Sequence, residues 1–283
     1  MNKPVSQQLA TATKALEAVS DTPRLDAELL MAHALGLSRN DLLLRARDLQ
    51  APPDFEALLL RRLAHEPVAY IRGYQEFWDQ TLTVTPATLI PRGDSETLIE
   101  AARTHFRSRT PPARILDLGT GSGALLLASL SLFPDAAGVA IDASDAALAV
   151  AQGNADRLGF GARTTFLHRS WRDSGWRDDL GQYDLILCNP PYVETDADLA
   201  PQVRAFEPAS ALFAGTDGLE DYKRLIPQVS ALLASGGVAI FEIGQGQAEA
   251  ISGLATNQGL AVQPHPDLAG IVRALSLSKP DSG

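Results

Sequence analysis

The stretch RILDLGTGSG, residues 114–123, joins a short apolar run to three alternating glycines. The run from Ile115 to Leu118 predicts a buried strand, and the apolar segment 124–132 predicts a helix. Glycine is needed where the backbone takes a positive φ or lies close to a ligand. A strand, a glycine turn and a helix together predict the nucleotide-binding edge of an α/β sheet. The candidate ligand-binding residues of the turn are Gly119, Thr120, Gly121, Ser122 and Gly123.

The spacing of these glycines narrows the class of ligand. G-x-G-x-G lacks the third-glycine offset of the dinucleotide fingerprint, and no phosphate-binding lysine follows it. Asp142 ends the next apolar run about 20 residues later, where an acidic side chain can bind both ribose hydroxyls. A nucleoside without phosphates indicates S-adenosylmethionine as the cofactor.

A second motif, Asn189-Pro190-Pro191-Tyr192, follows the apolar run 185–188. Proline has no backbone N–H and a fixed φ, so the strand must end here with unpaired carbonyl groups. The side-chain oxygen of Asn189 adds a hydrogen-bond acceptor, and Tyr192 offers an aromatic face. The motif predicts a receptor for a planar NH2 group, with Asn189 and Pro190 as catalytic acceptors and Pro191 and Tyr192 also binding substrate. Asn189 is also expected to contact the methionine end of the cofactor. These residues leave both amides and amino-purines open as substrates.

If the substrate is an amide, these acceptors must both position its nitrogen and stabilise the transition state. The lone pair of an amide nitrogen is delocalised, so attack on a methyl group needs accurate positioning. The N–H hydrogens become more positive as the nitrogen attacks, and the acceptors then bind the transition state more tightly than the ground state. Glu96 is a candidate for positioning the substrate or Arg92, although a helix-capping role for the segment 94–96 fits equally well.

The order of these motifs resembles that of class I S-adenosylmethionine-dependent methyltransferases that act on conjugated nitrogen. Further segments are similar to the glutamine N(5)-methyltransferases of peptide chain release factors. The resemblance spans nearly all of the chain. The segments that carry it are Glu76-Phe77-Trp78, residues 86–92 with Asp94 and Glu96, Val203 to Pro208, and residues 267–270 with Arg273.

This resemblance implies a Rossmann-like fold and methylation of the glutamine in the GGQ motif of a release factor. It also places Trp171 at the cofactor site, where its ring can stack on the adenine. The chain departs from the family pattern at two positions. Gly93 replaces a usual proline, and Ser170 replaces an acidic residue before Trp171. A serine hydroxyl can still accept a hydrogen bond from the adenine amine.

The pattern along the chain predicts three parts. Residues 1–73 are expected to form a helical substrate-recognition domain. Leu25, Leu29, Leu30 and Leu35 form one apolar stripe of its core, Gly36 ends that helix, and Asp54 caps another. Residues 74–90 are expected to form a β-hairpin linker, and residues 91–283 the methyltransferase domain. Apolar runs near residues 115, 139, 165, 185 and 238 alternate with helical patterns around 124, 145, 222 and 247, which predicts an α/β fold with a mostly parallel doubly wound sheet.

Composition excludes several classes of function. The net charge is −10 and no basic run exceeds Arg61-Arg62, which disfavours direct nucleic-acid binding. One cysteine, Cys188, excludes an intrachain disulfide, and the five histidines lack ligand spacing, so no metal is expected. No apolar tract is long enough to span a bilayer, and the polar start at residues 1–8 lacks a signal-peptide core. We expect a cytoplasmic monomer that does not contact membranes.

Other functions remain open on the residues alone. The related ribosomal-protein glutamine methyltransferases are the nearest alternative, but Asp94, Glu96 and residues 203–208 look more like the release-factor type. A DNA or RNA amino-methyltransferase would share Asn-Pro-Pro-Tyr for the same chemical reason. A regulatory module that binds cofactor without turnover is a non-enzymatic alternative, and the intact segment 189–192 argues against it.

Overall fold

The computed structural model describes residues 4–280 and divides into two compact units. The first comprises the chain up to Tyr74 together with Leu199–Phe206, and the second comprises Gln75–Asp198 and the chain from Glu207 onward. The first unit ends next to the boundary predicted at residue 73. It also takes in 199–206, which the sequence pattern assigned to the methyltransferase domain. The predicted outer limits, residues 1 and 283, lie outside the described residues.

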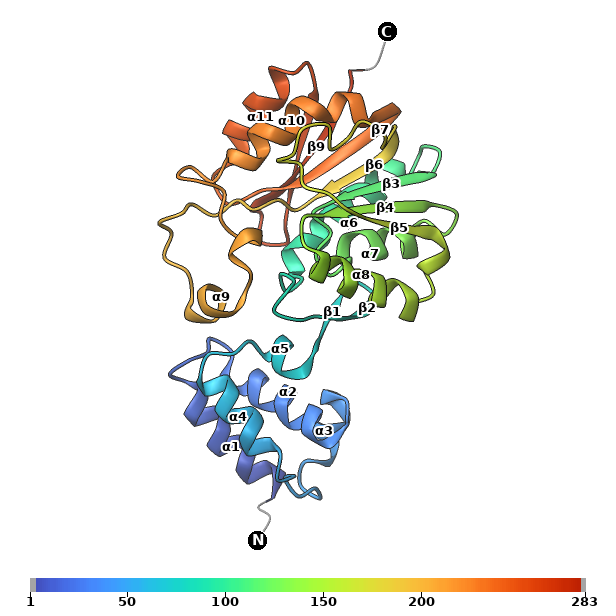
Figure 1. Cartoon of the computed structure of the whole chain (residues 1–283). Helices are drawn as coiled ribbons and strands as arrows, with labels where there is room; N and C mark the ends of the chain where they lie inside the picture. The colour runs from blue at the N-terminus through green and yellow to red at the C-terminus, as the bar shows by residue number, and fades with distance from the viewer. Residues whose placement is uncertain (1–3, 281–283) are drawn as a thin grey trace. The chain divides into compact units, whose positions relative to one another are not determined.

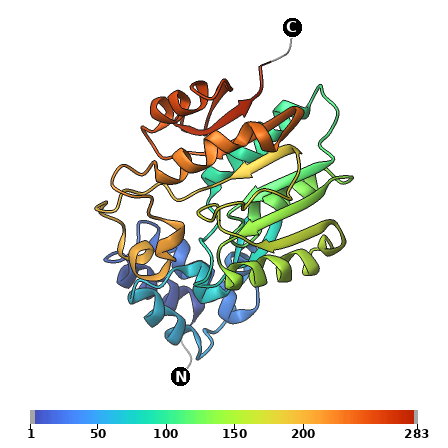
Figure 2. The same ribbon diagram turned by 45° about the horizontal axis from the view of Figure 1, so that its top comes forward.

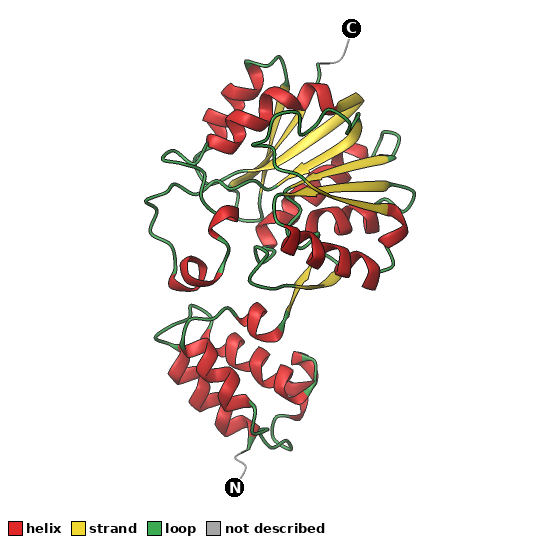
Figure 3. Cartoon of the chain, in the orientation of Figure 1, coloured by secondary structure: helices red, strands yellow, loops and turns green. Residues whose placement is uncertain are grey.

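The first unit is built of helices joined by loops, as Figure 3 shows. Its buried core includes Leu16, Leu30, Met31, Leu42 and Phe55. Their burial from several different helices gives the unit a hydrophobic core of its own. The helices are α1 (Val5–Leu16), α2 (Pro23–Leu35), α3 (Arg39–Arg45), α4 (Phe55–Leu63), α5 (Val68–Arg72) and α9 (Pro201–Phe206).

The predicted ends of these helices are partly confirmed. Gly36 ends α2 with a φ of 64°, the left-handed conformation that glycine adopts without strain. Asp54 precedes α4 but makes no side-chain capping bond, because its own backbone is already helical. Leu25 is 38% exposed, so its expected place in the core is wrong. Leu30 of the predicted stripe is fully buried, as expected. The buried face of α2 also includes Ala27 and Met31, which the prediction did not name, and Ala27 lies three residues before Leu30 and four before Met31.

A two-stranded sheet, β1 (Tyr74–Phe77) and β2 (Gln80–Thr83), follows the helices. It is shorter than the predicted hairpin segment, because residues 84–90 form turns and irregular backbone. Trp78 takes a φ of 57° in its turn, and its backbone N–H donates to the Glu96 carboxylate at 2.9 Å. Glu96 therefore anchors the turn rather than Arg92, which pairs with Glu207 at 2.8 Å.

The second unit contains a seven-stranded sheet in the order β5-β4-β3-β6-β7-β9-β8. The pairs from β5 to β7 are parallel, whereas β9 runs antiparallel to both β7 and β8. The mostly parallel α/β sheet predicted from the sequence is confirmed (Figure 1). Its strands are β3 (Arg114–Leu118), β4 (Ala137–Asp142), β5 (Thr164–His168), β6 (Tyr183–Cys188), β7 (Leu233–Glu242), β8 (Ala261–Pro266) and β9 (Val272–Ser278).

Helices cover both faces of this sheet, as Figures 1 and 2 show. Leu185 and Leu187 of β6 pack in the cluster that contains α6 and α7 side chains, and Ile186 packs with those of α10 and α11 on the opposite face. Successive strand residues point to opposite faces, so a continuous apolar strand serves two cores. The covering helices are α6 (Glu96–Phe106), α7 (Ala124–Leu132), α8 (Asp145–Arg157), α10 (Glu220–Leu232) and α11 (Ala248–Thr256).

Strand register brings the ends of three strands together. Leu118 is the Cα partner of Ile141 on one side and of Cys188 on the other. The residues that follow these partners are Gly119, Asp142 and Asn189. Strands β4 and β5 extend the sheet to one side of β3, and β6 and β7 extend it to the other. Such a reversal of strand order opens a crevice at the carboxyl ends of the strands.

The antiparallel strands β8 and β9 were not predicted. Alternation in β8 is interrupted by Pro264 and Pro266, which do not favour a strand. β9 buries Ala274, Leu275 and Leu277 against its neighbours. The antiparallel edge of the sheet is therefore determined by the pairing of β9 with β7, which is distant in the sequence.

The segment 194–211 leaves the sheet and returns to nearly the same point. Val193 and Phe213 form an isolated parallel bridge. The Val193 N–H donates to the Leu212 carbonyl at 2.9 Å, and the Ala214 N–H donates to the Val193 carbonyl at 2.9 Å. Both ends of the segment are thus fixed beside β6. Within residues 4–280, no helix combines the length and apolar character needed to cross a membrane.

Candidate active site

The glycine turn lies at the end of β3 in the conformation its sequence predicts. Gly119, Gly121 and Gly123 all have positive φ values, of 74°, 57° and 87°. The N–H groups of Gly119 and Thr120 donate to the Ile141 carbonyl, which ties the turn to β4. Gly123 precedes α7 and is its N-cap residue. The turn thus presents the start of a helix to the crevice, where free N–H groups favour a polar ligand.

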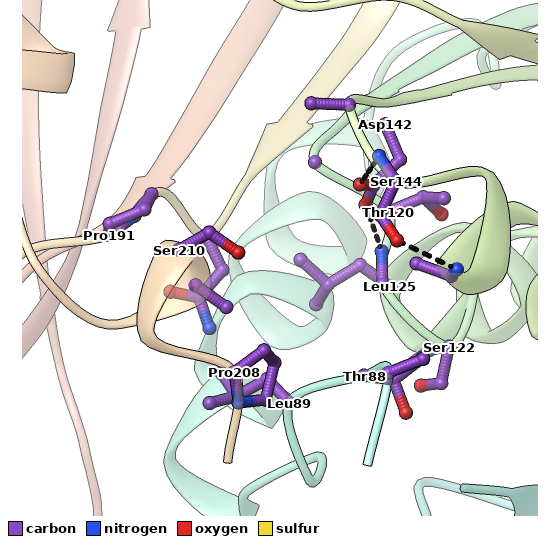
Figure 4. A pocket seen from close by; sticks show the side chains of 18 of the residues that line it. Thr88, Leu89, Thr120, Ser122, Leu125, Asp142, Ser144, Pro191, Pro208 and Ser210 are labelled. Carbon is purple, nitrogen blue, oxygen red and sulfur yellow. Dashed lines mark hydrogen bonds between the residues drawn. The ribbon is translucent and has the colours of Figure 1, made fainter. Parts of the chain in front are cut away.

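Asp142 fixes this turn as well as facing the cavity. Its Oδ2 accepts from the Gly121 N–H and its Oδ1 from the Ser144 N–H, both at 2.9 Å. Figure 4 shows Thr120, Asp142 and Ser144 along one side of the cavity, with Pro191 and Ser210 on the other. Each carboxylate oxygen has two lone pairs, so acceptor capacity remains for the hydroxyl groups of a ligand.

Trp171 covers the glycine turn. A Cβ atom added at Gly119 would lie 2.9 Å from Cη2 of the indole, so only glycine permits this approach. The indole Nε1 donates to Asp221 Oδ1 at 2.8 Å, and Arg172 forms an ion pair with the same fully buried carboxylate at 3.0 Å. Asp221, which the sequence did not single out, therefore sets the orientation of the ring. Ser170 also lines the cavity, and its hydroxyl accepts from the Arg172 N–H.

Asn189 follows the last residue of β6 and lines the same cavity together with Pro191. Its Nδ2 donates to the Ser95 hydroxyl in a long hydrogen bond of 3.5 Å. Pro190 is buried, and neither it nor Tyr192 is among the lining residues. The Tyr192 hydroxyl donates instead to Glu242 Oε1 at 3.3 Å, and its carbonyl accepts from Gln247. The structure thus brings Asn189 to the cavity and directs the Tyr192 hydroxyl towards β7.

Two buried carboxyl groups lie close to these motifs. Burial raises the pKa of Asp117 to about 7, the charge of Asp142 adds to this, and a hydrogen bond from Thr120 opposes it. Burial likewise raises the pKa of Glu242 to about 7, against the lowering effect of the Ser95 and Tyr192 hydroxyls. Asp117 supports the glycine turn through the Thr120 hydroxyl, which donates to it at 2.7 Å. Burial also raises the pKa of the Cys188 thiol, as expected of an unreactive buried cysteine.

A contact between two distant segments adjoins the cavity. The Glu207 carboxylate accepts from the Ile90 N–H at 3.2 Å and from Arg92 at 2.8 Å. Glu207 is only 6% exposed, so this contact joins the loop before α6 firmly to the segment after α9. Leu89, Pro91 and Pro208, which adjoin the contact, all line the cavity.

The cavity has a volume of about 560 Å³, within the range of small-molecule sites. The sequence predicted its glycine turn and two of its strand ends. It did not predict the lining residues that come from loops. Some of them lie in segments that carry the family resemblance, but the resemblance assigned them no role, and only the fold brings them near the glycine turn. These include Thr88, Leu89, Ser95, Pro208, Ser210 and Ala211.

The groups that line this cavity fit a nucleoside whose sugar carries no phosphate. The glycine turn admits a ligand close to the backbone, Asp142 offers oxygens to hydroxyl groups, and Trp171 offers a flat apolar surface. No lysine or histidine lies among the residues that line the cavity, and Arg172 is the one basic residue there. Such a lining suits a ligand without phosphate groups.

Comparisons with known proteins agree with this geometry. Residues 7–73 match the PrmC N-terminal domain, and residues 94–213 match the methyltransferase small domain. A protein of Bradyrhizobium diazoefficiens named release factor glutamine methyltransferase is 42% identical over 97% of this chain and 94% of its own length. A protein of the same name from Bordetella pertussis is 43% identical over 93% of this chain and 97% of its own length.

Solved structures of lower sequence identity share the same fold. The hMettl16 catalytic domain, in complex with the MAT2A 3'UTR hairpin 6, has a TM-score of 0.56 and 15% sequence identity. The match covers 82% of this chain and 94% of that one. This likeness shows a shared Rossmann-like methyltransferase fold and carries no information about substrate.

Proposed function

This chain belongs to the release factor glutamine methyltransferases, and from that premise we propose that it methylates the side-chain amide nitrogen of a glutamine in a peptide chain release factor. The methyl donor is S-adenosylmethionine, which supplies an electrophilic methyl group on a sulfonium centre. The substrate glutamine is the one in the GGQ motif that the family resemblance implies. The reaction forms a nitrogen–carbon bond, breaks a sulfur–carbon bond and releases one proton from the nitrogen.

The cofactor is proposed to bind along the glycine turn. Gly119 to Gly123 would line its methionine and ribose portions, and Asp142 would accept hydrogen bonds from the ribose hydroxyls. Trp171 would cover the adenine, while the Ser170 hydroxyl could accept from the adenine amine in place of the carboxylate usual in the family. The contact of Trp171 with Gly119 and its bond to Asp221 support this assignment, because they hold a flat ring at the edge of the turn.

The acceptor amide is proposed to bind at Asn189. Since Nδ2 of Asn189 points to Ser95, Oδ1 is left to accept an N–H of the substrate amide. The Pro190 carbonyl would accept the second N–H, and Pro191 and Tyr192 would shape the site around it. These acceptors strengthen as positive charge develops on the nitrogen, so they accelerate the transfer without a general base.

The observation that carries this proposal is the register of three adjacent strands. Leu118 of β3 pairs with Ile141 of β4 on one side and with Cys188 of β6 on the other. The glycine turn after β3 therefore lies between Asp142 and Asn189 along one edge of the sheet. A cofactor bound to the first two therefore presents its reactive group near the third. The helical residues 1–73 are proposed to recognise the folded release factor.

A single labelling experiment tests the function. The purified chain is incubated with S-adenosylmethionine labelled in its methyl group and, in parallel, with a release factor, ribosomal proteins, transfer RNA or DNA. We expect label in the release factor alone, and none when its GGQ glutamine is replaced by alanine. Label in ribosomal protein or in nucleic acid would instead support the corresponding alternative substrate.

A further inference from the structure

Asn154 of α8 is a buried amide side chain that connects the glycine turn with β2. Its Nδ2 donates to the Ser122 carbonyl at 2.9 Å and to the Thr83 carbonyl at 3.0 Å. Its Oδ1 accepts from the Thr83 N–H at 2.8 Å and from Arg157 at 2.9 Å. A side-chain amide has two N–H donors and an oxygen with two lone pairs, so its full capacity is used. Asn154 is 0% exposed, and burial of an amide costs free energy unless its polar groups are bonded in this way.

These bonds hold a part of the glycine turn that its other anchors do not reach. Ser122 lies in the turn and lines the cavity (Figure 4). The anchors on β4, which are the Ile141 carbonyl and the Asp142 carboxylate, accept from N–H groups of residues 119–121. Asn154 instead donates to a carbonyl group of the turn. Its support comes from Thr83, the last residue of β2, which is not among the residues that line the cavity.

The helix that carries Asn154 also borders the cavity. Ser144 is the N-cap residue of α8, it lines the cavity, and its N–H donates to Asp142. Ala147, in the first turn of α8, lines the cavity as well. The buried face of the helix continues from Ala147 through Ala151 to Asn154, at spacings of four and three residues. One helix therefore supports the candidate cofactor site at two points, the proposed ribose acceptor and the glycine turn.

We propose that Asn154 is a positioning residue of the cofactor site, which holds the glycine turn in its binding conformation by tying the Ser122 carbonyl to β2. This inference rests on the proposed function, because that function assigns the turn to S-adenosylmethionine. Asn154 is not among the lining residues, so it acts through Ser122 and not by touching the cofactor. Without Nδ2 the buried Ser122 carbonyl loses this donor, and the turn must move to bond elsewhere. The fraction of chains ready to bind cofactor then falls, and the measured affinity falls with it.

The first test compares two buried amides, each of which joins β2 to another segment. Asn154→Leu removes the bond to the glycine turn. Gln80→Met is the matched control, because Gln80 of β2 is 8% exposed and its Nε2 donates at 2.9 Å to the Leu127 carbonyl of α7, outside the turn. Calorimetry measures the affinity of each intact chain for S-adenosylmethionine, and denaturant unfolding measures its stability. The single-turnover rate is measured with cofactor and release factor both saturating.

Asn154→Leu should bind S-adenosylmethionine about tenfold or more weakly, whereas Gln80→Met should stay within about threefold of the unmodified chain. The saturated rate of Asn154→Leu should also stay within about threefold, because the acceptors at Asn189 and Pro190 are unchanged. Three results would each overturn the role of Asn154. They are an unchanged affinity in Asn154→Leu, an equal loss of affinity in Gln80→Met, and a saturated rate that falls as far as the affinity, which indicates general damage to the fold.

Hydrogen exchange in the unmodified chain gives a second test that does not depend on a variant folding. A bound cofactor fixes the turn and so keeps Asn154 in place, because the coupling between the two is reciprocal. The Thr83 N–H, which donates to Asn154, should therefore exchange about tenfold more slowly with S-adenosylmethionine bound. The control is the Ala113 N–H, which donates to Asp184 at 2.9 Å just before β3 begins, at the end of that strand away from the glycine turn. It should slow by less than about threefold.

The exchange data also separate this inference from the proposed function. Equal slowing at Thr83 and Ala113, or none at Thr83, would overturn the connection through Asn154. Failure of the unmodified chain to bind S-adenosylmethionine would overturn the cofactor assignment and this inference with it. Binding of the cofactor and slowing at Thr83, without transfer of methyl to a release factor, would overturn the proposed substrate alone.

Discussion

The indole of Trp171 lies so close to Gly119 that a methyl group on this glycine would come within 2.9 Å of Cη2. Gly121, two residues later, also has a positive φ but would meet nothing within 4 Å. A residue with a Cβ would be strained by the positive φ at either position, but only at position 119 would it also meet the indole ring. They provide a matched pair for testing what the ring contributes.

Gly119→Ala should weaken S-adenosylmethionine binding at least tenfold more than Gly121→Ala. Both substitutions cost about 1–2 kcal/mol in backbone strain, but only the first displaces Trp171. Calorimetric titration gives the affinities, and denaturant unfolding gives the strain. Equal losses of affinity in the two variants would show that Trp171 does not contact the cofactor.

Asp142→Ala should weaken cofactor binding by roughly 1.5 to 3 kcal/mol, the scale of hydrogen bonds to a charged group. The change removes the proposed acceptor for the ribose and also frees the N–H groups of Gly121 and Ser144. Asp145→Asn, an exposed position at the start of α8, serves as the control and should bind normally. An unchanged affinity in Asp142→Ala would remove Asp142 from the cofactor site.

Asn189→Ala should lower the single-turnover rate by about two to three orders of magnitude, as for the loss of a preorganised transition-state hydrogen bond. Cofactor affinity should change much less. Asn189→Asp keeps an acceptor but places a negative charge near the sulfonium, which favours the charged ground state, so its rate should also stay low. Rates within a few-fold of the unmodified chain in Asn189→Ala would contradict the acceptor role.

Asp117 should make the folded state less stable as pH rises from 4 to 7. Its pKa is raised to about 7 in the folded chain from an ordinary value of 3.8, so folding favours the protonated form. Its contribution is complete below pH 4 and is lost as pH rises through 7. Relative to the unmodified chain, Asp117→Asn should gain stability on the order of 4 kcal/mol across this interval. Unfolding curves at pH 4.5, 6 and 7.5 measure the difference, and a constant difference would contradict the shift.

Removal of residues 1–72 should leave cofactor binding nearly intact and abolish methylation of the whole release factor. The seven-stranded sheet and its covering helices have their own cores, whereas the proposed recognition surface is lost. A short peptide containing the GGQ motif is the control substrate and should be affected less than the folded factor. Full activity of the shortened chain on the intact factor would exclude docking by the helices.

The sequence predicted those parts of the molecule that local chemistry determines. Glycines at 119, 121 and 123 are needed for positive φ, and the prolines after Asn189 end β6, so both strand ends were located correctly. Strand β8 was missed because Pro264 and Pro266 interrupt its alternating pattern, and because only its pairing with β9, beyond a turn, makes it a strand. Asp221, Ser95 and Glu242 were missed for a different reason. Each acts through a side-chain contact with a residue distant in the sequence, at Trp171, Asn189 and Tyr192 respectively, and such pairs leave no spacing to detect.

The bridge between Val193 and Phe213 has a consequence for how such enzymes diverge. Since both ends of the segment 194–211 are fixed beside β6, insertions near residues 195–200 would lengthen it with little displacement of Asn189. The later part of the segment is constrained, because Glu207 binds Ile90 and Arg92 and Pro208 lines the cavity. The length of this loop can then change between relatives while the residues that end β6 are kept.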